Sequence, residues 1–216
     1  MMPRLRLLML DLDGTLIESL SVKDAAFARL YADAPRLDEI MAYHRSHNHV
    51  VRFDKFRHIS EHFLGTPLST KEDARLRESF ARFVVNGLIA CPEVTGARSL
   101  LDEYKGVLPM ILISRSPDSE LRHVLSARGL SPYFEEIYSA DWSKPDAISD
   151  ALSKQNVLPT EAVYVGDSPE DAEAAAAAGV VFIGRQSERD LCGLKAPIFA
   201  DMASVHAHLA TSYTTE

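Results

Sequence analysis

From Glu93 onward, short apolar runs alternate with amphipathic stretches. One further apolar run lies near the start of the chain. Runs rich in Val, Ile and Leu that are separated by helices predict a parallel sheet with helices on both faces. The predicted strands are residues 5–10, 107–113, 136–139, 162–165, 180–183 and 197–200. The predicted helices between them are residues 95–104, 117–128, 147–155 and 169–178.

The stretch from residue 18 to residue 90 follows a different pattern. Residues 21–32, 38–46, 54–64 and 69–85 have helical spacing, and no convincing strand lies among them. Pro35 and the turn Gly65-Thr66-Pro67 separate these helices. We therefore expect an α/β fold. Its Rossmann-like parallel-sheet core would comprise residues 1–17 and 91–216, interrupted by an all-helical domain at residues 18–90.

Composition and charge narrow the class of protein. The 216 residues are 46% hydrophobic and 25% charged, as in ordinary globular proteins. A formal net charge of −8 argues against nucleic acid as a partner, and no apolar run is long enough for a membrane span. Cys91 and Cys192 fit neither a disulfide framework nor a paired-cysteine metal site, which favours a cytoplasmic location.

Two acidic residues come directly after the first predicted strand. Asp11 and Asp13 stand two positions apart in Asp11-Leu12-Asp13-Gly14-Thr15. Ligands of open α/β sheets bind at the carboxyl ends of strands, and residues i and i+2 of an extended segment face the same way. Two such carboxylates repel each other unless a cation or a substrate lies between them. The pattern therefore favours a binding site over simple capping of the strand.

A second acidic pair follows the strand predicted at residues 162–165. In Gly166-Asp167-Ser168-Pro169-Glu170-Asp171, Ser168 is a good helix N-cap and Asp171 stands where a capping-box acid belongs. Asp171 thus has a structural explanation beside a metal-binding one, and both stay open. Asp167 is not needed for the cap, so its carboxylate is a candidate ligand for Mg²⁺, which prefers oxygen ligands.

Further polar residues lie where predicted elements meet. Ser114 ends the strand at residues 107–113, and Ser116-Pro117 predicts the start of the next helix. A hydroxyl beside a helix N-terminus suits the oxygens of a phosphate group. Lys144 stands before Pro145 and another predicted helix, and taken alone it is typical of a surface lysine.

These motifs together resemble the haloacid dehalogenase superfamily. The segment that contains Asp11 and Asp13, then Ser114, Lys144, and Gly166-Asp167 with Asp171 occur in the order and approximate spacing of its four motifs. The resemblance runs from Leu5 to about Leu209. Glu93-Val94-Thr95-Gly96-Ala97 and Leu130-Ser131-Pro132-Tyr133-Phe134 look like the phosphoglycolate phosphatase-like branch, and the helical insertion resembles the cap domain of that branch.

The resemblance implies a Mg²⁺-dependent phosphatase, a phosphoric monoester hydrolase. Its substrate would be a small phosphorylated metabolite, either phosphoglycolate-like or a sugar phosphate. Asp11 would be the nucleophile, ionised at neutral pH, and Asp13 the general acid and then the base. Ser114 and Lys144 would contact the phosphoryl oxygens. The implied metal ligands are the carboxylates of Asp11 and Asp167, the main-chain carbonyl of Asp13 and, unless it only caps a helix, Asp171.

Two positions depart from the pattern of the relatives. Arg115 stands where many of them have Asn, and it either contacts phosphate or substrate or points into solvent. Lys23 stands where mutases of this branch have His, which lowers the case for a sugar-phosphate mutase. Because Asp13 is present, carbon–halogen cleavage is not expected. The chain is expected to be a monomer or a homodimer.

We expect the helical domain to select the substrate. Between residues 44 and 58, Arg45, Arg52, Lys55 and Arg57 face a single acid, Asp54, in a chain of net charge −8. Arg52 and Lys55 are three positions apart on a predicted helix, so they can reach a common point and bind a second anionic group of the substrate. The alternative is a solvated basic face that merely pairs with acids on the core domain.

Other functions are less well supported by the residues. A phosphonoacetaldehyde-type hydrolase would use a lysine of the helical domain, such as Lys55, as a Schiff base. A catalytically silent binding protein is the alternative from another class, although silence usually shows as loss of the paired acids. A zinc site would combine His44, His47 and His49 with His58 or His62, which is weak without a known ligand spacing.

Overall fold

The computed structural model describes residues 2–47 and 52–215, and of Arg52 it describes the backbone only. The chain divides into two compact units. The first unit is Met1–Glu18 with Pro92–Glu216, and the second unit is Ser19–Cys91. The boundaries predicted after residues 17 and 90 each lie one residue from these.

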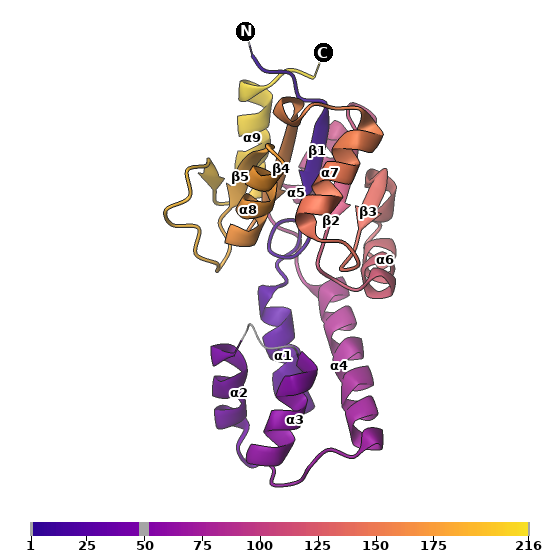
Figure 1. Cartoon of the computed structure of the whole chain (residues 1–216), viewed down its shortest axis with the longest axis vertical. Coiled ribbons are helices and arrows are strands. Elements are labelled where there is room, and N and C mark those ends of the chain that lie inside the picture. The colour runs from indigo at the N-terminus through magenta and orange to yellow at the C-terminus, as the bar shows by residue number, and fades with distance from the viewer. Residues whose placement is uncertain (1, 48–51, 216) are drawn as a thin grey trace. The chain divides into compact units, whose positions relative to one another are not determined.

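The first unit is built on a parallel sheet with the strand order β3-β2-β1-β4-β5-β6 (Figure 1). Each strand overlaps one of the predicted apolar runs, so the predicted α/β class with a Rossmann-like parallel sheet is confirmed. The strands are β1 Leu7–Leu10, β2 Met110–Ile113, β3 Glu136–Tyr138, β4 Ala162–Gly166, β5 Val181–Arg185 and β6 Ile198–Phe199.

Helices cover the sheet because its central strand is apolar on both faces. Leu7 and Met9 of β1 pack in one cluster with Ile148 of α7 and Ala175 of α8, while Leu8 and Leu10 alternate with them and are also fully buried. The helices of this unit are α5 Ala97–Tyr104, α6 Asp118–Ala127, α7 Lys144–Gln155, α8 Pro169–Ala177 and α9 Met202–Ser212. Short 3-10 turns lie at Ser131–Tyr133 and Pro159–Glu161. Helix α9 was not among the predicted elements.

The second unit consists of helices in the residues that the structure describes, as the sequence pattern predicts. They are α1 Leu20–Leu30, α2 Leu37–Ser46, α3 Arg52–His62 and α4 Thr70–Ala90. Phe27, Phe56 and Phe80 form its aromatic centre, with ring centroids 5.0 to 5.6 Å apart. In the described part of the chain, no helix is both long and apolar enough to cross a membrane.

Candidate active site

The first unit brings its acidic residues together at the carboxyl edge of the sheet. Strands β1 and β4 are parallel neighbours with Leu10 beside Val165, and the amide of Asp11 donates to the carbonyl of Val165 at 3.0 Å. Asp11 and Asp167 therefore leave the sheet side by side. Lys144 is the first residue of α7, which packs on β1 and β2. The fold thus places residues more than 130 positions apart in one small region.

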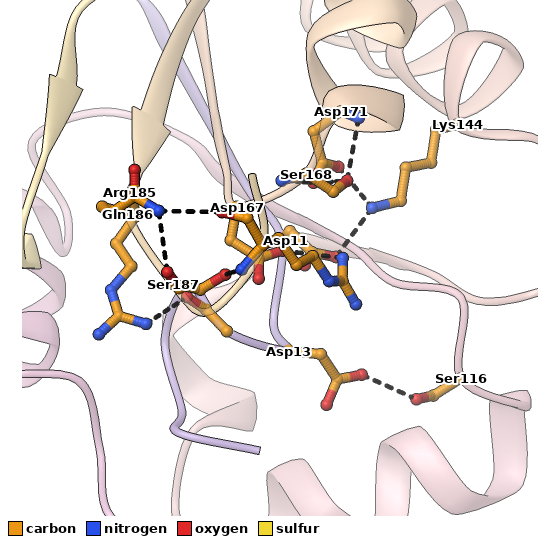
Figure 2. Close-up of polar contacts among 12 residues, drawn as sticks. Asp11, Asp13, Ser116, Lys144, Asp167, Ser168, Asp171, Arg185, Gln186 and Ser187 are labelled. Atoms are coloured by element: carbon orange, nitrogen blue, oxygen red, sulfur yellow. Dashed lines mark hydrogen bonds and ion pairs between the residues drawn. The ribbon is translucent and has the colours of Figure 1, made fainter. Parts of the chain in front are cut away.

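Lys144 lies between two carboxylates (Figure 2). Its Nζ donates to Oδ1 of Asp11 at 3.1 Å and to Oδ1 of Asp171 at 2.5 Å, and all three side chains are buried. Burial acts to lower the pKa of Lys144, but the neighbouring Asp11 and Asp171 outweigh it, and the pKa is raised. Lys144 is therefore a fixed positive charge inside the acidic cluster.

Asp171 serves the fold as well as the site. Its Oδ2 accepts from the amide of Ser168 at 3.1 Å and from the hydroxyl of Ser168 at 2.6 Å, which completes a capping box at the start of α8. Its Oδ1 also accepts from the hydroxyl of Tyr164 at 2.7 Å. Burial raises the pKa of Asp171, but Lys144 and these hydrogen bonds bring it below its usual value. The structural explanation of Asp171 is observed, and its metal-binding role stays a prediction.

Asp167 is fully buried and keeps one oxygen without a hydrogen-bond partner among the described residues, namely Oδ2. Its Oδ1 accepts from Nη1 of Arg189 at 3.0 Å. Gly14, at φ +77°, lets the chain pass close by, since a Cβ there would lie 2.0 Å from Oδ2 of Asp167. A buried, unpaired carboxylate oxygen is unfavourable unless a cation contacts it.

The donor set fits a hard divalent cation such as Mg²⁺. Asp11, Asp167 and Asp171 each offer a carboxylate oxygen, and these oxygens lie within 4.8 Å of one another. Oxygen ligands of this kind suit Mg²⁺, and the unpaired oxygen of Asp167 is the atom such an ion would satisfy. The carboxylate of Asp13 is not part of this group, and the expected contribution of its main-chain carbonyl stays a prediction.

The protonation state expected for Asp11 needs a correction. Burial raises the pKa of Asp11 to about 8, because Lys144 only partly offsets it and the carboxylates of Asp171, Asp13 and Asp167 add to it. The metal-free carboxyl group is therefore mostly protonated at pH 7, whereas the sequence suggested an ionised one. The reason is the depth of the site together with its excess of acids, neither of which a motif reveals.

Asp13 and Ser114 follow the parallel neighbours β1 and β2 at the same edge of the sheet. Asp13 is half-buried, and its Oδ2 accepts a long hydrogen bond of 3.5 Å from the hydroxyl of Ser116 (Figure 2). Ser114 is buried, and its Oγ accepts from the amide of Ser116 at 3.2 Å. Helix α6 begins at Asp118, directly after the Ser116-Pro117 pair that predicted its start, and Pro117 rather than Ser116 stands at its N-cap. Arg115 beside them is exposed.

The sequence did not reveal a buried arginine, Arg185, that supports the turn after β1. Nη1 of Arg185, at the end of β5, donates to the carbonyl of Gly14 at 2.9 Å, and its two Nη atoms also bind the carboxylate of Glu18. Arg189, which follows on the next segment, pairs with Asp167, and Tyr164 bonds Asp171. No spacing rule links these residues to the acids. Tyr164 reaches the acids because it lies within β4, and the two arginines reach them because β5 pairs with β4.

The substrate-binding residues predicted in the second unit have separate outcomes. Lys55 is buried, its Nζ donates to the carbonyl of His44 at 3.1 Å, and burial lowers its pKa. The alternative of a solvated face is therefore wrong for Lys55, since the helix packs that side chain inward. Arg45 and Arg57 form exposed ion pairs with Asp24 and Asp54, which belong to the same unit and not to the core domain. The side chain of Arg52 lies outside the described residues.

The structure gives no support to a zinc site of histidines. Among the described residues, the group of Asp11, Asp167 and Asp171 is the only set of metal-ligating side chains close enough to hold an ion. His47 and His58 instead pack against the ring of Tyr43. His49, which the zinc hypothesis included, lies outside the described residues.

Comparison with known proteins places the chain in a family. The model of the haloacid dehalogenase-like hydrolases matches residues 5–179. The chain belongs to this family. Over 193 residues it is 28% identical to a phosphoglycolate phosphatase of Pseudomonas putida, and this alignment covers 83% of this chain and 68% of that protein. Over 192 residues it is 27% identical to a phosphoglycolate phosphatase of Vibrio vulnificus, and this alignment covers 83% of both proteins.

A solved structure shows the same fold over almost the whole chain. A haloacid dehalogenase superfamily hydrolase of subfamily IA from Geobacter sulfurreducens superposes with a TM-score of 0.72 at 19% identity. The match covers 97% of this chain and 96% of that one. The family, with the two phosphatase relatives, confirms the predicted enzyme class, a phosphoric monoester hydrolase, and the resemblance to the phosphoglycolate phosphatase-like branch.

Proposed function

We propose that this member of the haloacid dehalogenase-like hydrolases is a Mg²⁺-dependent phosphatase. It hydrolyses a small phosphorylated metabolite through an aspartyl phosphate formed on Asp11. The observation that carries the proposal is Lys144 held between Asp11 and Asp171, beside the unpaired oxygen of Asp167. The names of the two phosphatase relatives support phosphoglycolate, or a similar phosphate ester, as the first substrate to test.

Mg²⁺ would be held by the carboxylates of Asp11 and Asp167 and by the main-chain carbonyl of Asp13. When bound, the ion would favour the ionised form of Asp11 and offset its repulsion from a phosphate dianion. In this proposal Asp171 holds Lys144 and the start of α8 through hydrogen bonds to both of its oxygens, and its role as a further metal ligand stays a prediction.

The chain's own residues then divide the chemistry between two steps. A carboxylate oxygen of Asp11 forms a bond to phosphorus as the bond from phosphorus to the leaving oxygen breaks, and Asp13 gives that oxygen its proton. Asp13 then takes a proton from the water that attacks phosphorus, which releases inorganic phosphate and restores Asp11. Lys144 and Ser114 stabilise the phosphoryl oxygens in both steps. Arg185 holds the turn that carries Asp13 through the carbonyl of Gly14.

A direct test measures phosphate release from phosphoglycolate, a sugar phosphate and a generic aryl phosphate. Turnover should require Mg²⁺, stop with a chelator, and fall below detection in Asp11→Asn. The matched control is Asp102→Asn, an exposed acid on α5 that bonds Tyr133, which should keep full activity. Rapid acid quenching with labelled substrate should leave phosphate on the wild-type chain and none on Asp11→Asn. Undiminished turnover in Asp11→Asn would refute the covalent mechanism.

The finer assignments stay predictions within this proposal. Arg52, Lys55 and Arg115 remain predicted substrate-binding residues, and residues 18–90 remain the predicted cap domain. One assay distinguishes the phosphonoacetaldehyde-type alternative from the proposed phosphatase. That alternative predicts phosphate release from a phosphonoaldehyde, and it predicts that borohydride blocks this release. A cytoplasmic location stays a prediction, and it is supported by Cys91 and Cys192 forming no disulfide in the described part of the chain.

A further inference from the structure

Arg189 is an ordered cation beside the acidic cluster that the proposed mechanism does not use. Its Nη1 donates to Oδ1 of Asp167 at 3.0 Å. Its own segment is held in place, because its amide donates to Oγ of Ser187 at 3.0 Å and the side chain of Gln186 donates to its carbonyl at 2.9 Å. The guanidinium is therefore positioned against a buried acid, while 39% of the side chain is exposed.

The charges of the cluster show what Arg189 does. Lys144 is bonded to Asp11 and Asp171, which leaves Asp167 as the buried acid of the cluster that Lys144 does not contact. Arg189 supplies the counter-charge for Asp167 through Oδ1 alone, and Oδ2 stays without a partner among the described residues. A cation that binds Oδ2 thus shares one carboxylate with a permanent positive charge.

We infer that Arg189 sets the Mg²⁺ affinity of the site by opposing the ion across Asp167. The guanidinium keeps Asp167 neutralised before the ion arrives and repels the ion once it has bound, so binding is weaker and more readily reversed. The inference rests on the proposed function, in which Asp167 is a ligand of Mg²⁺. Arg189 would thus act on the metal through the charge that it places on Asp167.

The competing explanation is that Arg189 strengthens Mg²⁺ binding. If the main effect of the guanidinium were to orient Asp167 for the ion, removing it would loosen the ligand and weaken Mg²⁺ binding. If the electrostatic repulsion dominates, removing the charge strengthens binding. The two effects differ in sign, so a measured affinity separates them without any activity assay.

The experiment is calorimetric titration of the full chain with Mg²⁺ for wild type, Arg189→Gln and Arg189→Lys. We expect Arg189→Gln to bind Mg²⁺ about five- to tenfold more tightly, the scale of one partly screened unit charge near a divalent ion. Arg189→Lys, which keeps the charge, should stay within about threefold of wild type. Circular dichroism of each variant confirms that it is folded.

Arg6→Gln is the matched control for net charge. Arg6 forms a single ion pair with Glu161, and 38% of its side chain is exposed, close to the value for Arg189. It precedes β1, at the end of the strand away from Asp11. The Mg²⁺ affinity of Arg6→Gln should equal that of wild type. Unchanged or weaker binding in Arg189→Gln would overturn the inference, as would equal tightening in Arg6→Gln. A wild-type chain that takes up no Mg²⁺ would instead refute the metal site of the proposed function.

Discussion

Asp11 combines two properties that oppose each other, deep burial and a role as nucleophile. Its pKa is raised to about 8, by burial first and by Asp171, Asp13 and Asp167 next, with Lys144 acting against them. An ordinary aspartate has a pKa near 3.9 in the unfolded chain. Between these two pH values the folded chain holds a proton that the unfolded chain has lost, so the stability contributed by this group falls as pH rises.

This linkage predicts how Asp11→Asn affects stability in the absence of Mg²⁺. The asparagine cannot ionise, so the variant should be more stable than wild type at pH 8 by on the order of several kcal/mol, because the two pKa values lie about four units apart at about 1.4 kcal/mol per unit. The advantage should shrink as pH falls and vanish below about pH 4, where Asp11 is protonated in both states. Urea unfolding at a series of pH values measures it.

Asp102→Asn serves again as the control, because Asp102 is exposed and lies outside the cluster. Its stability difference from wild type should change little with pH over the same range. A difference for Asp11→Asn that is constant between pH 4 and pH 8 would show that the pKa of Asp11 is not raised. Both comparisons use chelator throughout, so that no metal enters the linkage.

The residues of the site divide by how their positions are fixed. Asp11, Asp13, Ser114 and Asp167 could be singled out because each follows a predicted strand, whereas Lys144 was singled out only through the family resemblance. Tyr164 and Arg189 carry no such mark, Arg185 lies past the predicted end of its strand, and all three reach the acids through the order of strands β1, β4 and β5. The raised pKa of Asp11 likewise depends on burial that only the folded chain provides.

At the scale of elements, the apolar runs predicted all six strands that the described residues contain, while helix ends were less well determined. Helix α4 continues to Ala90, five residues past its predicted end, and α7 begins at Lys144, ahead of residue 147. Helix α9 was missed although signals for it exist. Asp201 caps it by accepting from the amide of Ser204 at 2.8 Å, and Met202, Val205 and Leu209 form its narrow buried stripe. A helix with only three buried apolar positions is difficult to distinguish, from the sequence, from an unstructured C-terminal segment.

The turn after β1 offers a prediction about element geometry. Gly14→Ala would place a Cβ 2.0 Å from Oδ2 of Asp167, and at φ +77° any side chain is strained. Asp167 must then move from the acidic cluster, so Mg²⁺ affinity should fall at least about tenfold, about 1.4 kcal/mol of binding free energy. Stability should fall by roughly 1–3 kcal/mol from the strained backbone.

Gly106→Ala separates the strain from the clash. Gly106 has nearly the same conformation, φ +75°, but nothing lies within 4 Å of its added Cβ. It should show the loss of stability from strain with Mg²⁺ affinity unchanged, as measured by thermal unfolding and calorimetric titration. Equal affinities for the two variants would mean that the close approach of Gly14 to Asp167 does not shape the metal site.

At the scale of the whole molecule, the chain passes from the first unit to the second after Glu18 and returns at Pro92. Every carboxylate of the described acidic cluster belongs to the first unit, whereas the second unit has its own aromatic centre around Phe27. The predicted division rests on sequence periodicity, since an all-helical stretch interrupts an alternation of strands and helices. The specific contacts of Lys55 inside the second unit were not predictable, since helical spacing does not distinguish a buried lysine from an exposed one.

This division predicts where Mg²⁺ should protect the chain from hydrogen exchange. A ligand raises the free energy of those openings that destroy its site, by about 2.7 kcal/mol at 100 times its dissociation constant. Amides of residues 11–17 and 163–171 should therefore exchange up to about a hundredfold more slowly with Mg²⁺. Amides in α1 and α4 should be unaffected, because their local openings release none of the ligands. Asp11→Asn, which loses one ligand, should show much weaker protection. Equal slowing across both units would mean that they open together, and that the second unit is not an independent folding unit.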